Sequence, residues 1–226
     1  MYKIAVFDMD GTLIDTLEDL RAAANYALTA SGFPERSREE FRQCIGNGQR
    51  MLVRQCLPEH ARDDGTVQRV IDIYAPYYAA HAAERTVVYG GIAEAIEKMR
   101  EAGMKIAVLS NKPHAPTVEL AETFFPGMID AAFGQRDHVP HKPDPAGLLM
   151  ILDGFGLSKE ECIYIGDSDV DMQTAINAGV DAIGVAWGYC TRDEIKNAGG
   201  RVIISETSQL APLVLGKREL SASATY

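Results

Sequence analysis

Cysteine is scarce in this chain, and its placement argues against a fold built on disulfides. The 226 residues contain four cysteines, and none of them forms a CxxC pair. A disulfide framework needs many cysteines in a short secreted chain, so we predict free thiols, as in a reducing cytosol. The four positions are Cys44, Cys56, Cys162 and Cys190.

Long apolar runs are also missing. No apolar stretch approaches the length of about 20 residues that a membrane-spanning helix needs. The amino-terminal segment MYKIAVFDMD meets charged residues too early for the apolar region of a secretory signal. We therefore predict a cytoplasmic protein with no membrane partner.

Positive charge is in short supply. The chain has 22 lysines and arginines against 32 aspartates and glutamates, which gives a formal net charge of −10. This balance does not favour nucleic acid as a partner, and the chain contains no block of basic residues that would form a basic patch. An acidic protein can still bind phosphate where its few cations are placed locally, so anionic small molecules remain candidates.

Several short apolar runs are present instead, and they predict the strands of a buried sheet. Runs of this length, separated by segments of helical periodicity, are typical of parallel sheets covered on both faces. We predict an α/β fold with a doubly wound parallel sheet. The runs are KIAVF (3–7), KIAVL (105–109), CIYI (162–165), AIGVA (182–186), RVII (201–204) and, more weakly, DAAF (130–133).

The segment between residues 15 and 84 differs because it contains no convincing strand. Thr16 with Asp19, and Ser37 with Glu40, have the spacing of capping boxes that begin helices. Such a segment is expected to form an all-helical domain inserted after the first strand. The predicted divisions are a core at 1–14 and 85–216, a helical domain at 15–84 and a polar tail at 217–226.

Four polar clusters lie near the ends of the predicted strands. In open parallel sheets ligands bind beyond the carboxyl ends of the strands, so these clusters are expected to share one crevice. Three of them follow strands directly, and the fourth precedes a helix on the same side. They contain Asp8, Asp10, Gly11 and Thr12; Ser110, Asn111 and Lys112; Lys142; and Asp167, Asp169 and Asp171.

The aspartates of these clusters would repel one another at short range. Two carboxylates about 4 Å apart cost about 4 kcal/mol even at an effective dielectric constant near 20. Either some of them are protonated or a cation lies among them, and Mg²⁺ suits carboxylates, waters and a substrate phosphate. Lys142 and Ser110 could then bind phosphoryl oxygens. The set predicts phosphoryl transfer to a carboxylate nucleophile.

In this order, the motifs DMDGTLIDT, LSNK, HKPDP and GDSDVD resemble the four motifs of the haloacid dehalogenase-like hydrolases. The resemblance covers nearly the whole chain, including a helical cap inserted after the first motif. It is greatest with the phosphoglycolate phosphatase group, whose cap carries a segment similar to Ile45-Gly46-Asn47-Gly48. It implies a Rossmann-like core, a cap that sets specificity and Mg²⁺ as the cofactor.

The resemblance also implies a role for each motif residue. Asp8 is expected to be the nucleophile and a metal ligand. Asp10 is expected to be the general acid and base, with its backbone carbonyl helping to hold the metal. Ser110 and Lys142 are expected to bind the transferring phosphoryl group, and Asp167 to ligate the metal. The other expected phosphate-binding or substrate-binding residues are Gly11, Thr12, Asn111, Gly46, Asn47, Gly48 and Arg50.

Some of these residues also fit plain structural roles. Ser168 and Asp171 have capping-box spacing, so Asp171 is predicted as a metal ligand, as a partner that positions Lys142, or as a helix cap. Arg50 and Arg54 lie on one helix face and fit a solvated cap surface as well as a substrate site. The aromatic residues Tyr74, Tyr77 and Tyr78 are expected to pack cap helices together rather than to bind substrate.

The combined prediction is a Mg²⁺-dependent phosphatase that hydrolyses a small phosphomonoester through a phosphoryl-aspartate, with 2-phosphoglycolate as the favoured substrate. A phosphomutase of the β-phosphoglucomutase type and a pyrophosphatase would use the same residues and stay open. Asp10 and Asp167 argue against carbon–halogen hydrolysis, and the four intact motifs argue against a protein that only binds. The expected partner is a small phosphorylated metabolite, and the chain is expected to be a monomer or a homodimer.

Overall fold

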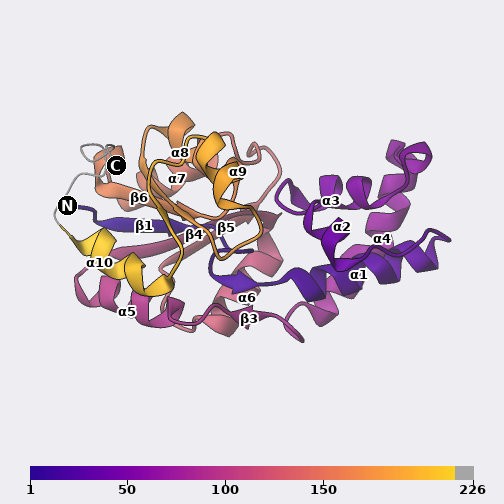
Figure 1. The fold of residues 1–226 in the computed structure, drawn as a ribbon, viewed down its shortest axis with the longest axis horizontal. Coiled ribbons are helices and arrows are strands. Elements are labelled where there is room, and N and C mark those ends of the chain that lie inside the picture. Colours follow the sequence, from indigo (N-terminus) through magenta and orange to yellow (C-terminus); the bar gives the residue numbers. More distant parts are fainter. Residues whose placement is uncertain (217–226) are drawn as a thin grey trace.

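The computed structural model describes residues 1–216, which form a parallel sheet with helices on both faces and a separate helical lobe at one end (Figure 1). The predicted polar tail at 217–226 lies outside the described residues. The sheet has the strand order β5-β4-β1-β6-β7-β8, and every pairing in it is parallel. Its strands are β1 (Ile4–Phe7), β4 (Lys105–Pro113), β5 (Ala131–Gln135), β6 (Cys162–Gly166), β7 (Asp181–Val185) and β8 (Ile203–Ile204).

All six apolar runs predicted as strands belong to this sheet, which confirms the predicted doubly wound α/β class. The main difference lies in β4, which continues past the predicted end at Leu109 as far as Pro113. Its pairing with β5 is irregular between these two residues. The extension carries the polar Ser110, Asn111 and Lys112 on a strand rather than in a loop.

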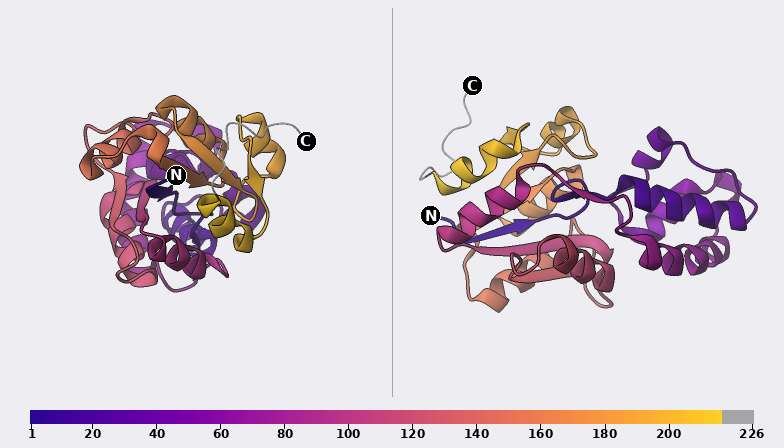
Figure 2. Two further views of the ribbon diagram at one scale, coloured as in Figure 1. Left: turned by 90° about the vertical axis from the view of Figure 1, so that its left-hand side faces the viewer. Right: turned by 90° about the horizontal axis from the view of Figure 1, so that it is seen from below.

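Helices cover both faces of the sheet (Figure 2). Strand side chains alternate between the faces, so Phe7 packs with the helices at 92–101, 114–124 and 210–215, whereas Val6 packs with those at 146–155 and 169–178. Among the described residues, no helix combines the length and the apolar composition needed to cross a membrane. The bounds are α5 (Ile92–Glu101), α6 (His114–Phe124), α7 (Ala146–Phe155), α8 (Asp169–Ala178), α9 (Arg192–Asn197) and α10 (Leu210–Leu215), with 3₁₀ turns η2 (Lys159–Glu161) and η3 (Thr207–Gln209).

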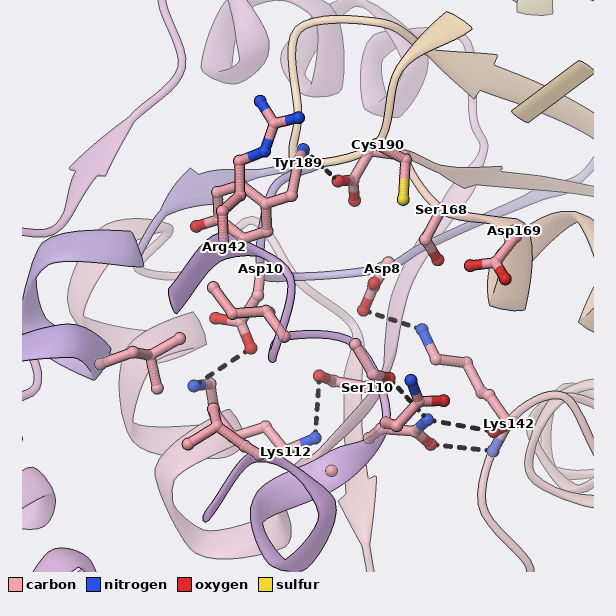
Figure 3. A pocket seen from close by; sticks show the side chains of 18 of the residues that line it. Asp8, Asp10, Arg42, Ser110, Lys112, Lys142, Ser168, Asp169, Tyr189 and Cys190 are labelled. Carbon is pink, nitrogen blue, oxygen red and sulfur yellow. Dashed lines mark hydrogen bonds and ion pairs between the residues drawn. The ribbon is translucent and has the colours of Figure 1, made fainter. Parts of the chain in front are cut away.

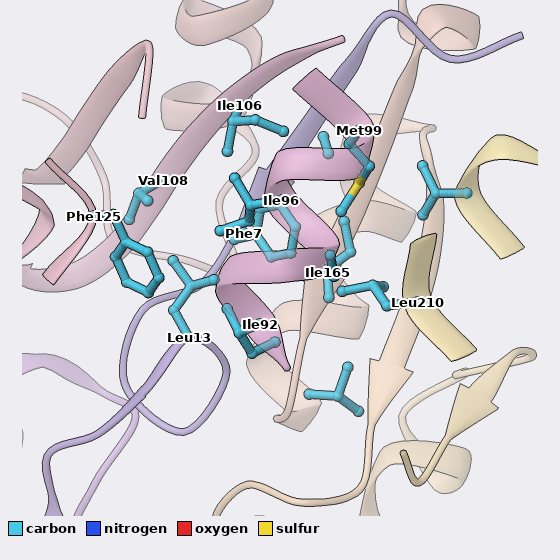
Figure 4. Packing of buried hydrophobic residues seen from close by; sticks show 14 of the residues in the cluster. Phe7, Leu13, Ile92, Ile96, Met99, Ile106, Val108, Phe125, Ile165 and Leu210 are labelled. Atoms are coloured by element: carbon cyan, nitrogen blue, oxygen red, sulfur yellow. The ribbon is translucent and has the colours of Figure 1, made fainter. Parts of the chain in front are cut away.

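The larger core cluster fixes the central strands against α5. Phe7 of β1 lies beside Ile96 of α5, with Ile165 of β6 and Val108 of β4 in the same cluster (Figure 4). All four side chains are fully buried. Burying one such side chain stabilises a fold by about 1.5–3 kcal/mol, so the strand ends that follow these residues are held firmly.

The helical lobe, called the cap here, consists of four helices with a hydrophobic cluster of their own. Leu28, Phe41 and Leu57 are fully buried within it. An inserted all-helical cap is therefore confirmed as part of the fold class, whereas the domain boundaries at 14/15 and 84/85 stay predictions. The cap helices are α1 (Leu17–Ala30), α2 (Arg38–Arg42), α3 (Gly48–Cys56) and α4 (Asp64–His81), with the 3₁₀ turn η1 (Glu59–Ala61).

A short antiparallel ribbon joins the cap to the sheet. It pairs β2 (Ile14–Asp15) with β3 (Val87–Val88), so the chain leaves and re-enters the core side by side. The right-hand view of Figure 2 shows the cap beyond this junction. The carboxyl ends of the sheet strands and the cap thus face each other across one boundary.

Of the two capping boxes predicted within the helical segment 15–84, one is present and the other is wrong. The box at residues 37 and 40 begins α2 as expected. Thr16 precedes α1 but makes no side-chain cap, and the Asp19 carboxylate accepts hydrogen bonds from the backbone N–H groups of Arg85 and Thr86. Long-range partners replaced the local ones, which residue spacing alone does not reveal.

Candidate active site

A cavity of about 570 Å³ lies where the cap meets the carboxyl ends of the sheet strands. Each of the four predicted polar clusters contributes to its lining (Figure 3). The cap contributes the predicted Gly46, Asn47 and Gly48. The lining residues from the core clusters are Asp8, Asp10, Ser110, Asn111, Lys112, Lys142, Asp167 and Asp169.

Asp8 directly follows β1 and is only 9% exposed. Its Oδ1 accepts a hydrogen bond from the Met9 N–H at 2.7 Å and pairs with Lys142 Nζ at 2.9 Å. Its Oδ2 has no hydrogen-bond partner among the described residues. Burial, together with the charge of Asp171, raises the pKa of Asp8 well above its usual value, and Lys142 acts in the opposite direction. One carboxylate oxygen is therefore fixed while the other is free to react.

Lys142 is a buried cation with three partners. Its Nζ lies 2.9 Å from Asp8 Oδ1 and 2.7 Å from Asp171 Oδ1, and it donates to Tyr164 Oη at 3.2 Å. Burial alone would lower the pKa of Lys142, but the carboxylates of Asp171 and Asp8 outweigh it and hold that pKa well above its usual value. Lys142 thus stays charged beside Asp8.

Asp171 serves two of its predicted roles at once. Its backbone N–H and its Oδ2 complete a capping box with Ser168 at the start of α8. Its Oδ1 pairs with Lys142 and accepts a hydrogen bond from Tyr164. Asp171 is fully buried, so this carboxylate orients the lysine from behind. Its third predicted role, as a metal ligand, stays a prediction.

The aspartates form a group that fits a divalent cation. Asp8, Asp167 and Asp171 each offer an oxygen, and these oxygens lie within 4.8 Å of one another. Lys142 is their one cationic contact within the described part of the chain, so a net negative charge remains. A carboxylate set of this kind suits a hard cation such as Mg²⁺.

Asp167 is held rigidly inside this group. Its Oδ1 accepts a hydrogen bond from Thr12 Oγ1 at 2.8 Å, and its Oδ2 accepts one from the Tyr189 N–H at 2.7 Å. A Cβ atom at Gly11 or Gly188 would lie 2.3 Å from Asp167 Oδ2, so the two glycines make the space for this carboxylate. Burial and the charge of Asp171 raise the pKa of Asp167 to about 7. A cation at this position would offset the free-energy cost of ionising the buried Asp167 carboxyl group.

Ser110 and Asn111 are brought to the same site with different surroundings. Ser110 Oγ accepts a hydrogen bond from the Lys112 N–H, and no acceptor for its own proton exists among the residues that the structure describes. The Asn111 side chain donates to the carbonyls of Gly46 and Lys142 and accepts from the Lys142 N–H. Ser110 is therefore available to a phosphoryl oxygen, whereas the Asn111 side chain ties the cap to the lysine loop, which leaves its backbone for the predicted phosphate contact.

The glycine segment of the cap allows close contact with the core. Gly48 has a φ of +78°, and an added Cβ atom would lie 2.9 Å from His141 Cε1. A side chain at this position would be strained and would push the cap away from the loop that carries Lys142. The segment 45–48, which was predicted to bind substrate, therefore also forms a contact surface between cap and core.

Arg50 lies outside the cavity lining, as do the predicted Gly11, Thr12 and Asp171, but it has partners of its own in the cap. Its guanidinium group pairs with Asp64 at 2.9 Å and donates to Gln68 at 3.0 Å. Arg54 pairs with the same aspartate. These contacts favour the solvated cap surface, the alternative role of Arg50, and its acidic partner comes from α4, which residue spacing within α3 could not show.

Asp10 has a partner that the sequence did not reveal. Its Oδ1 accepts a hydrogen bond from Thr16 Oγ1 at 2.6 Å, and its Oδ2 lies 3.1 Å from Lys112 Nζ. Lys112 in turn donates to the hydroxyl of Tyr78 in α4. Tyr74 and Tyr78 pack in the cap cluster as expected, but both also line the cavity. Lys112 was visible in the LSNK motif without an assigned role.

The loop after β7 is a further contributor that sequence analysis missed. The backbone N–H of Tyr189 donates to Asp167, and the Tyr189 hydroxyl accepts a hydrogen bond from the Thr16 N–H at 2.8 Å. Trp187 Nε1 donates to the Thr12 carbonyl at 3.1 Å. A signal existed, since these residues follow the predicted strand at 182–186 and so fall at the same edge of the sheet.

Comparison with known proteins gives consistent matches. The family model described as haloacid dehalogenase-like hydrolase matches residues 5–185. A phosphoglycolate phosphatase of Pseudomonas putida is 33% identical over 215 residues, covering 93% of this chain and 79% of the relative. One from Psychrobacter arcticus is 28% identical and covers 94% and 96%. A crystal structure of a provisionally assigned phosphoglycolate phosphatase from Lactobacillus delbrueckii has a TM-score of 0.90 at 33% identity, with 96% and 99% coverage.

Proposed function

The chain belongs to the haloacid dehalogenase-like hydrolase family, and we propose that it is a Mg²⁺-dependent phosphatase whose preferred substrate is 2-phosphoglycolate. Relatives named phosphoglycolate phosphatase, at 33% identity in Pseudomonas putida and 32% in Pseudomonas aeruginosa, make it a phosphoric monoester hydrolase. The observation that carries the proposal is the Asp8 carboxylate, with Oδ1 bound to Lys142 and Oδ2 free in the cavity.

In the first step, Asp8 acts as the nucleophile. Its free oxygen forms a bond to phosphorus while the bond from phosphorus to the ester oxygen breaks. The electron pair of that bond stays on the leaving oxygen, which takes a proton from the carboxyl group of Asp10. The products of this step are the alcohol, a phosphoryl group on Asp8 and an ionised Asp10.

In the second step, water removes the phosphoryl group. The Asp10 carboxylate takes a proton from the water as its oxygen bonds to phosphorus. The bond between phosphorus and the Asp8 oxygen breaks, which releases inorganic phosphate and restores the Asp8 carboxylate. Asp10 ends the cycle protonated, ready to serve again as the acid.

Other residues of the site would hold the phosphoryl group during both steps. The Ser110 hydroxyl has a free proton to donate, and Lys142 supplies positive charge beside Asp8. Mg²⁺, held by Asp8, Asp167 and the backbone carbonyl of Asp10, would neutralise charge on the phosphoryl oxygens. The cap covers the site, and its side chains would contact the remainder of the substrate.

The test is a survey of phosphate release. The purified protein is incubated with Mg²⁺ and a panel that includes 2-phosphoglycolate, hexose phosphates, other organic acid phosphates and pyrophosphate. We expect inorganic phosphate from monoesters, with the highest kcat/KM for 2-phosphoglycolate, and loss of activity on adding EDTA. An isomeric sugar phosphate in place of free phosphate would indicate a mutase, and no release from any compound would count decisively against the proposal.

A further inference from the structure

Lys112 is a buried ammonium group in contact with both halves of the molecule. Its side chain is 3% exposed, and lysines are rarely buried to this extent without partners. Its Nζ lies 3.1 Å from Asp10 Oδ2 and donates to the Tyr78 hydroxyl at 2.8 Å. Lys112 and Asp10 belong to the core, whereas Tyr78 belongs to cap helix α4. A single ammonium group therefore connects the cap to Asp10.

We propose that Lys112 and Tyr78 are positioning residues for Asp10. Lys112 orients the Asp10 carboxylate, and Tyr78 orients Lys112 when the cap rests on the core. The inference rests on the proposed function, in which Asp10 transfers the proton in both steps. It goes further because it links that proton transfer to cap contact through two side chains with no other assigned role.

The geometry around Asp10 favours positioning over simple charge balance. One carboxylate oxygen is held by Thr16 Oγ1 and the other by Lys112, so the plane of the carboxylate is fixed from two sides. Removal of either partner would leave the group free to rotate about its side-chain torsions. Since Thr16 lies next to the ribbon that joins the cap, Lys112 is the partner that comes from the sheet itself.

The two lysines of the site have separate tasks. Lys142 pairs with Asp8, whereas Lys112 pairs with Asp10 (Figure 3). Lys142 also pairs with Asp171. Each of the two reacting aspartates thus has its own ammonium group. Loss of Lys112 should therefore impair the proton-transfer residue and leave the nucleophile with its partner.

The Tyr78 ring strengthens the same connection. The ammonium group lies 4.6 Å from the ring centroid as well as in contact with the hydroxyl. Tyr78 is 4% exposed, so a shift of α4 away from the core would remove both contacts at once. Tyr77, its neighbour in α4, instead stacks on Tyr26 and does not line the cavity, which makes it a matched control.

The experiment compares Lys112→Met, Tyr78→Phe, the double variant and Tyr77→Phe, using 2-phosphoglycolate or the best substrate of the panel. We expect Lys112→Met to lower kcat by about 10- to 100-fold with KM within about 3-fold, since misplacing a reacting group by about 1 Å costs up to about 100-fold. Tyr78→Phe should lower kcat by about 3- to 10-fold, and Tyr77→Phe should have no effect. The double variant should be no worse than Lys112→Met, because the hydroxyl acts through the ammonium group.

One further variant separates positioning from folding. Lys112→Arg keeps the positive charge and should retain more activity than Lys112→Met at an equal thermal midpoint. If Lys112→Met does not fold, the difference between Tyr78→Phe and Tyr77→Phe decides the matter alone. Additive losses in the double variant, an effect on KM only, or equal behaviour of the two tyrosine variants would overturn the inference. A wild-type protein that releases no phosphate would instead refute the proposed function.

Discussion

At the scale of single residues, the two oxygens of Asp8 have unequal surroundings. Oδ1 is fixed by the Met9 N–H and by Lys142, and Oδ2 is unpaired within the described residues. Replacement with asparagine keeps the shape but removes the nucleophile. We expect Asp8→Asn to lower phosphate release by at least about 10³-fold. The thermal midpoint should not fall, because a buried charge is removed.

The control for this variant is Asp169→Asn. Asp169 lines the same cavity but is exposed at the start of α8. Its replacement should change kcat/KM by less than about 3-fold, since solvent screens an exposed charge. If Asp8→Asn retained as much activity as Asp169→Asn, Asp8 would not be the nucleophile.

Asp167 gives a prediction about pH and metal. Burial raises its pKa to about 7 in the folded chain, against about 3.9 for a free aspartate. Between these values the folded chain binds more protons than the unfolded chain, so metal-free stability falls as the pH rises from about 4 to about 7. We expect a lower thermal midpoint in EDTA at about pH 8 than at about pH 5.5, and a larger increase on adding Mg²⁺ at about pH 8, where protons compete less.

The Asp167→Asn variant serves as the control for this measurement. Without the carboxylate, both the pH dependence and the response to Mg²⁺ should shrink. A thermal midpoint in EDTA that rises between about pH 5.5 and about pH 8 would contradict the assignment of this dependence to Asp167.

At the scale of secondary-structure elements, the segment before α3 sets how closely the cap approaches the core. Gly48 has a φ of +78° and leaves no room for a Cβ beside His141. We expect Gly48→Ala to lower the free energy of unfolding by about 1–2 kcal/mol, the cost of a left-handed non-glycine residue. We also expect kcat/KM to fall by about 10-fold or more, because a displaced cap misplaces the site. Chemical denaturation and phosphate release measure the two effects.

Gly154→Ala is the matched control at this scale. Gly154 lies in α7, has no atom within 4 Å of an added Cβ and needs no left-handed conformation. Alanine should stabilise that helix by about 0.5–1 kcal/mol with unchanged activity. If Gly48→Ala changed neither the free energy of unfolding nor kcat/KM more than Gly154→Ala does, the close approach of cap and core at Gly48 would not be needed for activity.

The elements differ in how well the sequence predicts them. Six apolar runs were sufficient for the six sheet strands, because burial on both faces imposes a composition that is visible locally. The ribbon of β2 and β3 was not predicted. Each strand has only two residues, and each forms only because it pairs with a distant one, as Ile14 pairs with Val88 across 73 intervening positions. The failed capping box of Thr16 and Asp19 has a related cause, because Asp19 instead binds the backbone of the distant Arg85 and Thr86.

At the scale of the whole molecule, the net charge of −10 opposes the approach of an anionic substrate. The Debye length falls from about 30 Å at 0.01 M salt to about 8 Å at 0.15 M, so the repulsion is screened as salt is added. We expect kcat/KM for 2-phosphoglycolate to rise over this range at saturating Mg²⁺. The increase should be smaller for p-nitrophenyl phosphate, which carries less negative charge.

A fall of kcat/KM with added salt would show the opposite. It would mean that Lys112, Lys142 and Arg42, which all line the cavity, dominate the field that the substrate meets. Steady-state rates at several salt concentrations, with Mg²⁺ held constant, distinguish the two cases.

The sequence was most informative where several motifs constrain one another. Asp8, Ser110 and Asp167 were predicted to meet because strand ends in a parallel sheet share an edge, and Lys142 because its loop precedes a helix on the same side. The structure places all four around one cavity. Contacts between the cap and the core were not predictable, because they depend on how two separately packed units sit together. The contact of Lys112 with Tyr78 is of this kind. The pair of Arg50 with Asp64 lies within the cap, between α3 and α4, and residue spacing within one helix could not reveal it either.

The ribbon of β2 and β3 has a consequence for how such molecules diversify. Asp15 and Val87 are paired neighbours, and paired residues in antiparallel strands lie about 5 Å apart. The spacing requires only that the two ends of an insert meet here, so the core strands on either side place no other geometric demand on it. Exchange of the cap at this junction would keep Asp8, Lys142 and Asp167, which belong to the core, but a new cap would have to supply its own partner for Lys112 in place of Tyr78.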